Sequence, residues 1–283
     1  MVINLRGKAY DLNETPLVMG ILNHTPDSFY AGSRIQGETA IRQRIQDILT
    51  EGANIIDVGG YSTRPDAPEV SAEQEWQRVA EVLKIIRTEA PNAVVSVDTF
   101  RAEVARRAVT EFEADIINDV SGGLLDNAMY DTIAQLQVPY ILMHMRGTPQ
   151  TMQQLTQYDG NVTDQVIQEL LPPLNTLQEK GVTDIILDPG FGFSKNMEQN
   201  YELMAELKKF TALKLPLLVG VSRKSMIYKL LDATPADALN GTTVLNTYSL
   251  LQGAHILRVH DVWAASEAVK IVTQLKKNTP TQK

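Results

Sequence analysis

Short apolar runs rich in valine and isoleucine recur along the chain and predict buried β-strands. Eight such runs occur, and they are nearly free of charge except where they end. They cover residues 17–23, 54–60, 93–99, 115–122, 139–145, 184–190, 216–222 and 254–260.

The longer segments between these runs carry apolar residues three and four positions apart, which is typical of amphipathic helices. Ser71, followed by Gln74 three residues later, has the pattern of a capping box at the start of one helix. Pro172 and Pro173 should kink or break the helix around them, because proline has no backbone N–H. The predicted helices cover residues 38–51, 71–89, 101–112, 165–180, 200–210 and 262–277, and a frayed tail is expected at 278–283.

Strands that alternate with helices predict a parallel sheet covered on both faces. Eight strand–helix units over about 250 residues match the size of a (β/α)8 TIM barrel, so we expect residues 1–283 to form a single barrel domain. The alternative is an open doubly wound sheet, in which a G-x-G-x-x-G turn is expected after the first strand. The sequence has neither that turn nor a G-x-x-x-x-G-K-[ST] loop, and the barrel is favoured.

Composition narrows the class of partner. The chain has 283 residues, 43% of them hydrophobic, and a formal net charge of −8, with no long basic run. Nucleic acid and anionic membranes are therefore poor candidates. Cysteine is absent, which excludes disulfides, thiolate metal sites and a cysteine nucleophile. With no signal-peptide core and no apolar run of about 20 residues, a cytoplasmic protein is expected.

Polar residues follow nearly every predicted strand, where the active sites of such barrels are built. They are Asn23, Asp57 with Ser62, Thr63 and Arg64, Asp98, Asn118 with Asp119, His144, Asp188, Ser222 with Arg223 and Lys224, and Arg258 with His260.

Each residue also has a simpler explanation. Asp98 could cap the next helix, and Asn118 with Asp119 could form a turn. Asp57 could bind the backbone near two glycines, and the charges at 222–224 could belong to a solvated loop. His144 could be a core histidine, with Met143 and Met145 packing beside it. Capping alone, however, does not predict polar groups at the end of nearly every strand.

The set suits a ligand with two different ends. Carboxylates and an asparagine accept hydrogen bonds, as required by a planar heterocycle with adjacent N–H donors. The cationic residues Arg64, Arg223, Lys224, Arg258 and His260 suit an anion such as a phosphate. Asn23 could be an oxygen ligand for Mg²⁺ bound to phosphates, since this ion often takes few protein ligands. No histidine–carboxylate spacing resembles a zinc site.

Eight stretches in order resemble the motifs of the dihydropteroate synthase family. They are MGILNHTPDSF (19–29), IIDVGGYSTRPDA (55–67), SVDTFRAEVA (96–105), IINDVSGG (116–123), MHMRGTPQTMQ (143–153), LDPGFGFSKN (187–196), LLVGVSRKSMI (217–227) and GAHILRVHDV (253–262). The resemblance covers Leu17 to Val262. It implies condensation of (7,8-dihydropterin-6-yl)methyl diphosphate with 4-aminobenzoate to give 7,8-dihydropteroate and diphosphate, with Mg²⁺ as cofactor and a homodimer by family analogy.

The resemblance also implies site residues, carried over motif by motif. The pterin would contact Asp98, Asn118, Met143, Asp188, Phe193, Gly220, Lys224 and Arg258. The diphosphate would contact Asn23, Thr63, Arg64, Arg258 and His260, with Asn23 on the Mg²⁺. The aminobenzoate would contact Thr63, Pro65, Phe193, Ser222 and Lys224. The catalytic roles would fall to Asp98, Lys224, Arg258 and Asp27.

The sequence departs from the family pattern after TPDSF, where Tyr30 and Ala31 replace the usual Ser-Asp and remove a loop acid. Tyr61 for the usual glutamate and Asp66 for the usual glycine are interpreted as surface variations. Two rival functions remain. A methyltransferase binding methyltetrahydrofolate would need no diphosphate site, and a non-catalytic pterin carrier would need neither anion ligands nor Mg²⁺.

Overall fold

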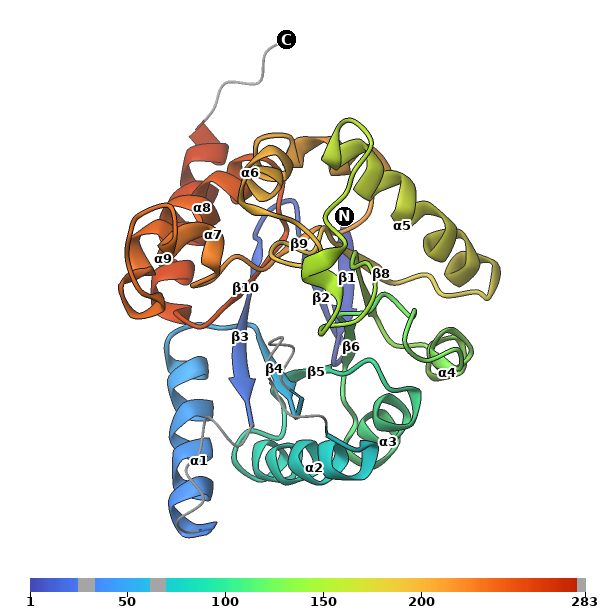
Figure 1. Cartoon of the computed structure of the whole chain (residues 1–283). Coiled ribbons are helices and arrows are strands. Elements are labelled where there is room, and N and C mark those ends of the chain that lie inside the picture. Colours follow the sequence, from blue (N-terminus) through green and yellow to red (C-terminus); the bar gives the residue numbers. More distant parts are fainter. Residues whose placement is uncertain (25–33, 62–69, 279–283) are drawn as a thin grey trace.

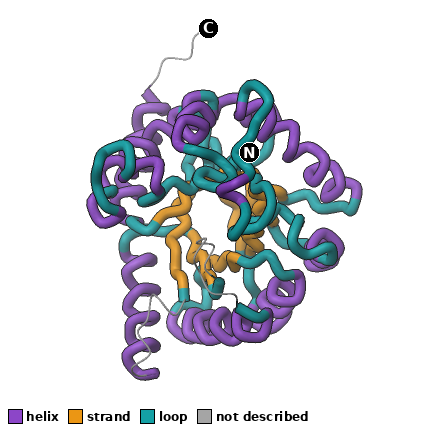
Figure 2. Tube along the Cα trace, in the orientation of Figure 1, coloured by secondary structure: helices purple, strands orange, loops and turns teal. Residues whose placement is uncertain are grey.

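Eight parallel strands form a closed barrel with helices around it (Figures 1 and 2). The computed structural model describes residues 1–24, 34–61 and 70–278. The strands are β3 Leu17–Asn23, β4 Ile55–Gly59, β5 Val94–Asp98, β6 Ile116–Asp119, β7 Tyr140–Met143, β8 Ile185–Asp188, β9 Leu218–Val219 and β10 Ile256–Val259. They pair in the order β8-β7-β6-β5-β4-β3-β10-β9, and a parallel bridge between Leu187 and Leu217 joins the two ends of that row. The predicted TIM barrel is confirmed.

The helices form the outer ring of the barrel (Figure 2). They are α1 Arg34–Thr50, α2 Ala72–Glu89, α3 Ala102–Phe112, α4 Met129–Leu136, α5 Val162–Glu179, α6 Met197–Ala205, α7 Ser225–Tyr228, α8 Leu239–Leu251 and α9 Val262–Asn278. Three 3₁₀ turns accompany them: η1 Met152–Gln154, η2 Leu207–Leu213 and η3 Pro235–Asp237. Among the residues described, no helix is long and apolar enough to cross a bilayer.

The capping box predicted at Ser71 is present. The Ser71 hydroxyl accepts from the Gln74 backbone N–H at 3.2 Å, and the Gln74 side chain accepts from the Ser71 N–H at 3.0 Å. These two bonds satisfy backbone donors that the first turn of α2 would otherwise leave unpaired.

The break predicted at the proline pair is wrong, because α5 runs through Pro172 and Pro173 without interruption. Leu170, Leu174 and Leu177 lie on the buried side of this helix, one turn apart. Burying a leucine side chain contributes about 1.5–3 kcal/mol, so the three outweigh the loss of two backbone donors on the helix surface.

An N-terminal hairpin covers one end of the barrel. Its strands are β1 Val2–Leu5 and β2 Lys8–Asp11, which pair antiparallel. Ile3, Leu5 and Leu12 pack against one inward-facing apolar residue from each barrel strand: Met19, Ile55, Val94, Ile116, Ile141, Ile186, Leu218 and Ile256. The hairpin closes the N-terminal end of the barrel, and the sequence patterns did not predict it.

The inward-facing positions two residues farther along the strands are mostly polar. Side chains alternate between the two faces of a strand, so the residue after next points into the barrel again. These positions are Ile21, Asp57, Ser96, Asn118, Met143, Asp188, Gly220 and Arg258. The barrel interior therefore changes from apolar to mostly polar at this level, which forms the floor of the candidate site together with Asp98, two residues farther along β5.

Candidate active site

The centre of the floor is an arginine held between two carboxylates. Arg258 donates from Nε to Asp57 Oδ2 and from Nη2 to Asp98 Oδ2, both at 2.6 Å. Asp57 is fully buried, and the Asn118 amide nitrogen lies 3.4 Å from its Oδ2. The four side chains come from β10, β4, β5 and β6, so the convergence predicted from the strand ends is confirmed for them. With both carboxylates ionised, the trio of Asp57, Asp98 and Arg258 carries one net negative charge.

The Asp98 carboxyl titrates far from its ordinary range. Burial raises its pKa to about 7, the Arg258 guanidinium opposes this shift, and the Asp57 charge adds to it. The helix that follows has Arg101 at its N-cap position with no side-chain cap bond. The capping explanation for Asp98 is therefore wrong, and its carboxylate faces the barrel interior.

Asp188 lies at the end of β8 beside two lysines. Its Oδ1 accepts from the Gly190 backbone N–H at 2.8 Å, and 6% of the residue is exposed. Burial raises its pKa, whereas the charges of Lys224, Arg258 and Lys195 lower it. Burial lowers the pKa of Lys224 to about 8, with Asp188 opposing the shift. This part of the floor pairs an acceptor with a cationic donor.

Lys224 reaches over the loop after β8. Its ammonium donates to the Phe191 carbonyl and lies 4.8 Å from the centre of the Phe193 ring. Phe193 packs against an apolar cluster that contains the buried Met143 and Met145, and this cluster with Phe193 forms an apolar wall. Gly220 faces Arg258, and a Cβ at Gly220 would stand 3.7 Å from the Arg258 Cβ. The glycine leaves the face of the arginine open.

The rim opposite this wall carries Asn23, Ser222 and His260. The Ser222 hydroxyl lies 3.1 Å from the His260 backbone nitrogen and 3.2 Å from its ring Nδ1. His260 is exposed at the rim, and partial burial of its ring together with the charge of Arg258 lowers its pKa to about 4. A neutral imidazole keeps one N–H donor for an anion, but it supplies no charge at neutral pH.

Arg223 is not available to a ligand, contrary to the expectation that it binds an anion. Its Nε and Nη2 each bond Asp261 at 2.8 Å, and Nη1 donates to the carbonyls of Pro235 and Ala236 at 2.7 Å. The bidentate pair ties the loop after β9 to the end of β10. Arg223 therefore stabilises the loops of the rim and does not face the ligand site.

Two further strand-end residues are structural. Asp119 accepts from the Ser121 and Gly123 backbone N–H groups and from the Tyr140 hydroxyl, which confirms the turn interpretation for this residue. Asn118 beside it belongs to the floor instead. His144 is a satisfied buried histidine, as its simpler explanation predicted, with Glu169 2.9 Å from Nε2.

Several predicted site residues lie outside the described part of the chain. They are Asp27, Thr63, Arg64 and Pro65, together with Tyr30, Ala31, Ser62 and Asp66. Tyr61, just before the second of these segments, packs edge-to-face on Phe100 with ring centres 5.1 Å apart. Its hydroxyl accepts from Gln150 at 3.0 Å. Tyr61 thus joins the ends of β4, β5 and β7 and is more than a surface variation.

Asn23 has the donor chemistry of a Mg²⁺ ligand. Its side chain is exposed at the end of β3, and its Oδ1 lies against Gly59, where a Cβ would come within 2.8 Å. A glycine there leaves room for the amide oxygen at the rim. Among the described residues, no group of three or more histidine and acidic side chains could hold a metal. The residues present fit an ion held mainly by its phosphate ligand and water.

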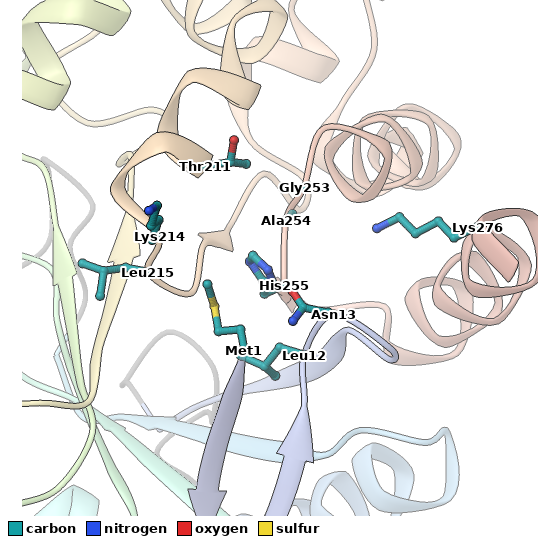
Figure 3. Close-up of a pocket in the computed structure, with 10 residues that line it drawn as sticks. All are labelled: Met1, Leu12, Asn13, Thr211, Lys214, Leu215, Gly253, Ala254, His255 and Lys276. Atoms are coloured by element: carbon teal, nitrogen blue, oxygen red, sulfur yellow. The ribbon is translucent and has the colours of Figure 1, made fainter. Parts of the chain in front are cut away.

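A cavity of about 500 Å³ opens at the other end of the barrel, beside the hairpin (Figure 3). His255, Lys214 and Lys276 line it, and the Leu217 backbone N–H donates to His255 Nδ1 at 3.1 Å. None of the polar floor or rim residues lines this cavity. In such barrels this end governs stability rather than chemistry.

Lys195 is a buried charged residue that sequence reasoning did not assign. It follows Phe193 in a stretch quoted for its resemblance, yet only 3% of it is exposed. A lysine after a glycine-rich turn is ordinarily solvated. Its burial depends on His144 of another strand, which no local pattern could reveal.

The chain resembles proteins of one family in sequence and structure. The family described as "Pterin binding enzyme" matches residues 19–260. The dihydropteroate synthase of Escherichia coli is 42% identical over 274 residues, covering 96% of this chain and 95% of that protein. The Clostridium difficile dihydropteroate synthase, solved with pteroic acid, is 33% identical with a TM-score of 0.88, covering 95% of this chain and all of that one. The Xanthomonas albilineans enzyme, solved with 4-aminobenzoic acid, gives the same identity and TM-score over 99% of each chain.

Proposed function

Because the chain belongs to the pterin binding enzyme family and, within it, to the dihydropteroate synthases, we propose a role for each polar group at its strand ends. The protein condenses (7,8-dihydropterin-6-yl)methyl diphosphate with 4-aminobenzoate, giving 7,8-dihydropteroate and diphosphate in folate biosynthesis. The observation that best supports these roles is the arrangement of charged side chains on the floor. Arg258 lies between Asp57 and Asp98, and Asp188 lies near Lys224.

The pterin occupies the floor in this proposal. Asp188 accepts the 2-amino and N3 hydrogens through the lone pairs that Gly190 leaves open, and Lys224 donates to the carbonyl edge. Asn118 and Asp98 hold the other ring, and Arg258 lies against its face beside Gly220. Met143 and Phe193 supply the apolar wall. A donor-rich heterocycle is thereby matched with acceptors in a site largely shielded from water.

The charge of the floor suits a cationic transition state. The C–O bond to diphosphate breaks while the aminobenzoate nitrogen forms a C–N bond, and one N–H proton leaves to water. The net negative trio of Asp57, Asp98 and Arg258 stabilises positive charge that develops on the pterin methylene. The arylamine is neutral at pH 7, so no strong base is needed. Asp27 stays a candidate for this step outside the described residues.

The leaving diphosphate lies at the rim in this proposal. Asn23 and His260 contact it together with Arg258, and Thr63 and Arg64 complete the set from outside the described residues. Asn23 would hold Mg²⁺, and when bound this ion neutralises the charge of the leaving group. Ser222 with Lys224 and Phe193 would frame the aminobenzoate, and Pro65 would close its pocket. The single domain 1–283 and the cytoplasmic location stay predictions.

We also propose a homodimer. Large apolar side chains are exposed along α8 and α9: Leu239, Val244, Leu251, Trp263, Ile271 and Leu275. An exposed apolar surface of this kind is typical of a protein interface. Sedimentation equilibrium should give twice the monomer mass, and a monomer at micromolar concentration would contradict the proposal.

One assay tests the function. Purified protein is incubated with the pterin diphosphate and Mg²⁺, with and without 4-aminobenzoate, and diphosphate release is measured. We expect release that depends on 4-aminobenzoate, with 7,8-dihydropteroate formed in equal amount. Release without 4-aminobenzoate, or no release with both substrates present, would contradict the assignment. A methyltransferase or a pterin carrier would give no release.

A further inference from the structure

The buried ammonium of Lys195 has three acceptors around it. Its Nζ lies 3.0 Å from the carbonyl oxygens of Gly190 and Phe193 and 3.0 Å from His144 Nδ1. A lysine ammonium has three N–H bonds, so all of its donors are satisfied in this pocket. An uncompensated buried charge costs several kcal/mol, and this complete set of partners is what allows the lysine to be buried.

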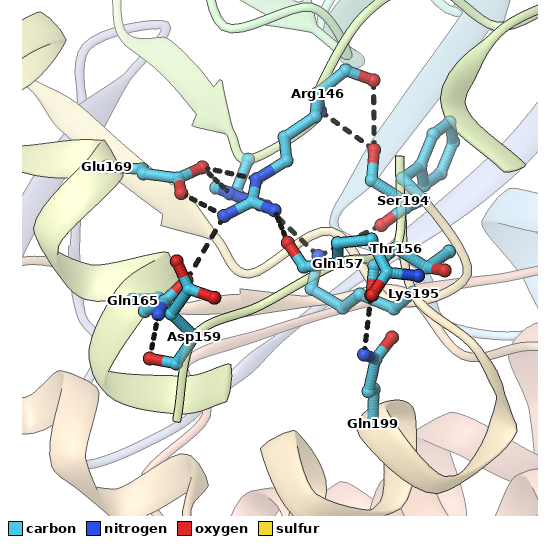
Figure 4. Close-up of polar contacts among 11 residues, drawn as sticks. Arg146, Thr156, Gln157, Asp159, Gln165, Glu169, Ser194, Lys195 and Gln199 are labelled. Atoms are coloured by element: carbon cyan, nitrogen blue, oxygen red, sulfur yellow. Dashed lines mark hydrogen bonds and ion pairs between the residues drawn. The ribbon is translucent and has the colours of Figure 1, made fainter. Parts of the chain in front are cut away.

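The hydrogen bonds of Lys195 connect to a larger set of polar contacts that includes Arg146 and Glu169 (Figure 4). Because His144 Nδ1 accepts from the lysine, the ring proton is on Nε2, which donates to Glu169 Oε2 at 2.9 Å. Glu169 also bonds Arg146 Nε at 3.0 Å. Burial lowers the pKa of Lys195 to about 7, whereas the negative charges of Asp188 and Glu169 oppose this shift. The positive charge is thus stabilised by a carboxylate on each side.

Lys195 binds the turn that contains Phe193, an aromatic residue of the wall of the proposed pterin site. Lys195 binds the first and last carbonyls of the turn from Gly190 to Phe193, and Lys224 binds the Phe191 carbonyl between them. The turn is tight, since a Cβ at Gly190 would stand 2.0 Å from the His144 carbonyl oxygen and Gly190 has φ +70°. One lysine fixes the ends of the turn, and the other fixes its middle.

We propose that Lys195 is a positioning residue for the pterin, one that fixes the turn bearing Phe193 and, through Gly190, the backbone N–H that orients Asp188. Lys195 is surrounded by carbonyls and His144, so it acts through the turn rather than by touching substrate. The inference rests on the proposed pterin site, and it adds a residue whose loss should change pterin affinity more than turnover.

The test compares Lys195→Met with Lys208→Met, a matched exchange at an exposed lysine of η2. Steady-state kinetics should show the KM for the pterin diphosphate rising at least tenfold in Lys195→Met, with the KM for 4-aminobenzoate and kcat changed less than threefold. The control should match the wild type. If a folded Lys195→Met lowers the melting temperature but leaves the pterin KM within twofold, the lysine only stabilises the barrel and the proposal is wrong.

A second variant covers the case in which the buried exchange does not fold. Glu169→Gln removes the outer carboxylate from a half-exposed position, and we expect the pterin KM to rise about three- to tenfold. An unchanged pterin KM in this variant also overturns the proposal. Wild-type diphosphate release that requires 4-aminobenzoate is measured in the same series. Failure of that control rejects the proposed function, whereas an active wild type with indifferent variants rejects only the role of Lys195.

Discussion

Asp188→Asn should weaken pterin binding by about 1.5 to 3 orders of magnitude without unfolding the protein. The carboxylate has one oxygen on the Gly190 N–H at 2.8 Å, so an asparagine must place its NH₂ group either against that backbone donor or against the N–H groups of the pterin. Either choice sets two donors against each other, at a cost of about 1–3 kcal/mol. The bonds that survive also lose their charge assistance, which roughly halves their strength.

Together these terms amount to about 2–4 kcal/mol, or a roughly 30- to 1,000-fold loss of affinity. Isothermal titration calorimetry with 6-hydroxymethyl-7,8-dihydropterin measures the effect directly, on protein whose circular dichroism matches the wild type. Asp184→Asn, at the exposed residue just before the same strand, is the matched control and should bind normally. If Asp188→Asn binds the pterin within threefold of the wild type, Asp188 does not accept hydrogen bonds from the ring.

Three further outcomes are expected. kcat/KM for the pterin diphosphate should be bell-shaped in pH: it falls below about pH 7 as Asp98 gains a proton and above about pH 7 to 8 as Lys195 and then Lys224 lose one, and Asp98→Asn should lack the acid limb. A profile that is flat from pH 6 to 9 would contradict these pKa values. Arg223→Ala should lower the free energy of unfolding by about 1–2 kcal/mol in urea, because the half-buried Asp261 loses its bidentate partner. Calorimetry should show 4-aminobenzoate binding at least tenfold more tightly with Mg²⁺ and diphosphate present, and equal affinity would mean that its pocket is preformed.

The barrel could be predicted because its signals are local. A short apolar run predicts a buried strand from its own residues, without knowledge of its partners. All eight predicted runs contain a strand. All of the predicted runs except 17–23 extend past the ends of their strands, because a turn begins earlier than the apolar pattern indicates: β6 ends at Asp119, whose side chain accepts from the backbone of the turn that follows. The N-terminal hairpin was missed because β2 is short and largely exposed, with a burial pattern that shows little contrast. The hairpin packs on the end of the barrel, whose strands are mostly far from it in the sequence, so no local pattern indicates where it lies.

The site could be predicted only as a set of residues near one another. The positions of Asp57, Asp98 and Arg258 followed from strand order, but their bonding did not. The same residue types at Arg223 and Asp261 form a support outside the floor. Arg258 faces the ligand site and Arg223 does not, because the backbone after each strand runs in a different direction. Arg223 has a φ of +55°, and this backbone conformation points its side chain away from the floor. Sequence spacing does not encode that turn.

The hairpin that closes the barrel also bears on the order in which the chain folds. Its apolar side chains pack on all eight strands, including Leu218 of β9 and Ile256 of β10, the last two strands in the sequence. The hairpin therefore cannot complete its contacts until strands far downstream in the sequence are present. Contacts so distant in sequence slow folding and leave apolar surface uncovered meanwhile. The hairpin that covers one end of the barrel is thus also expected to complete its packing late in folding.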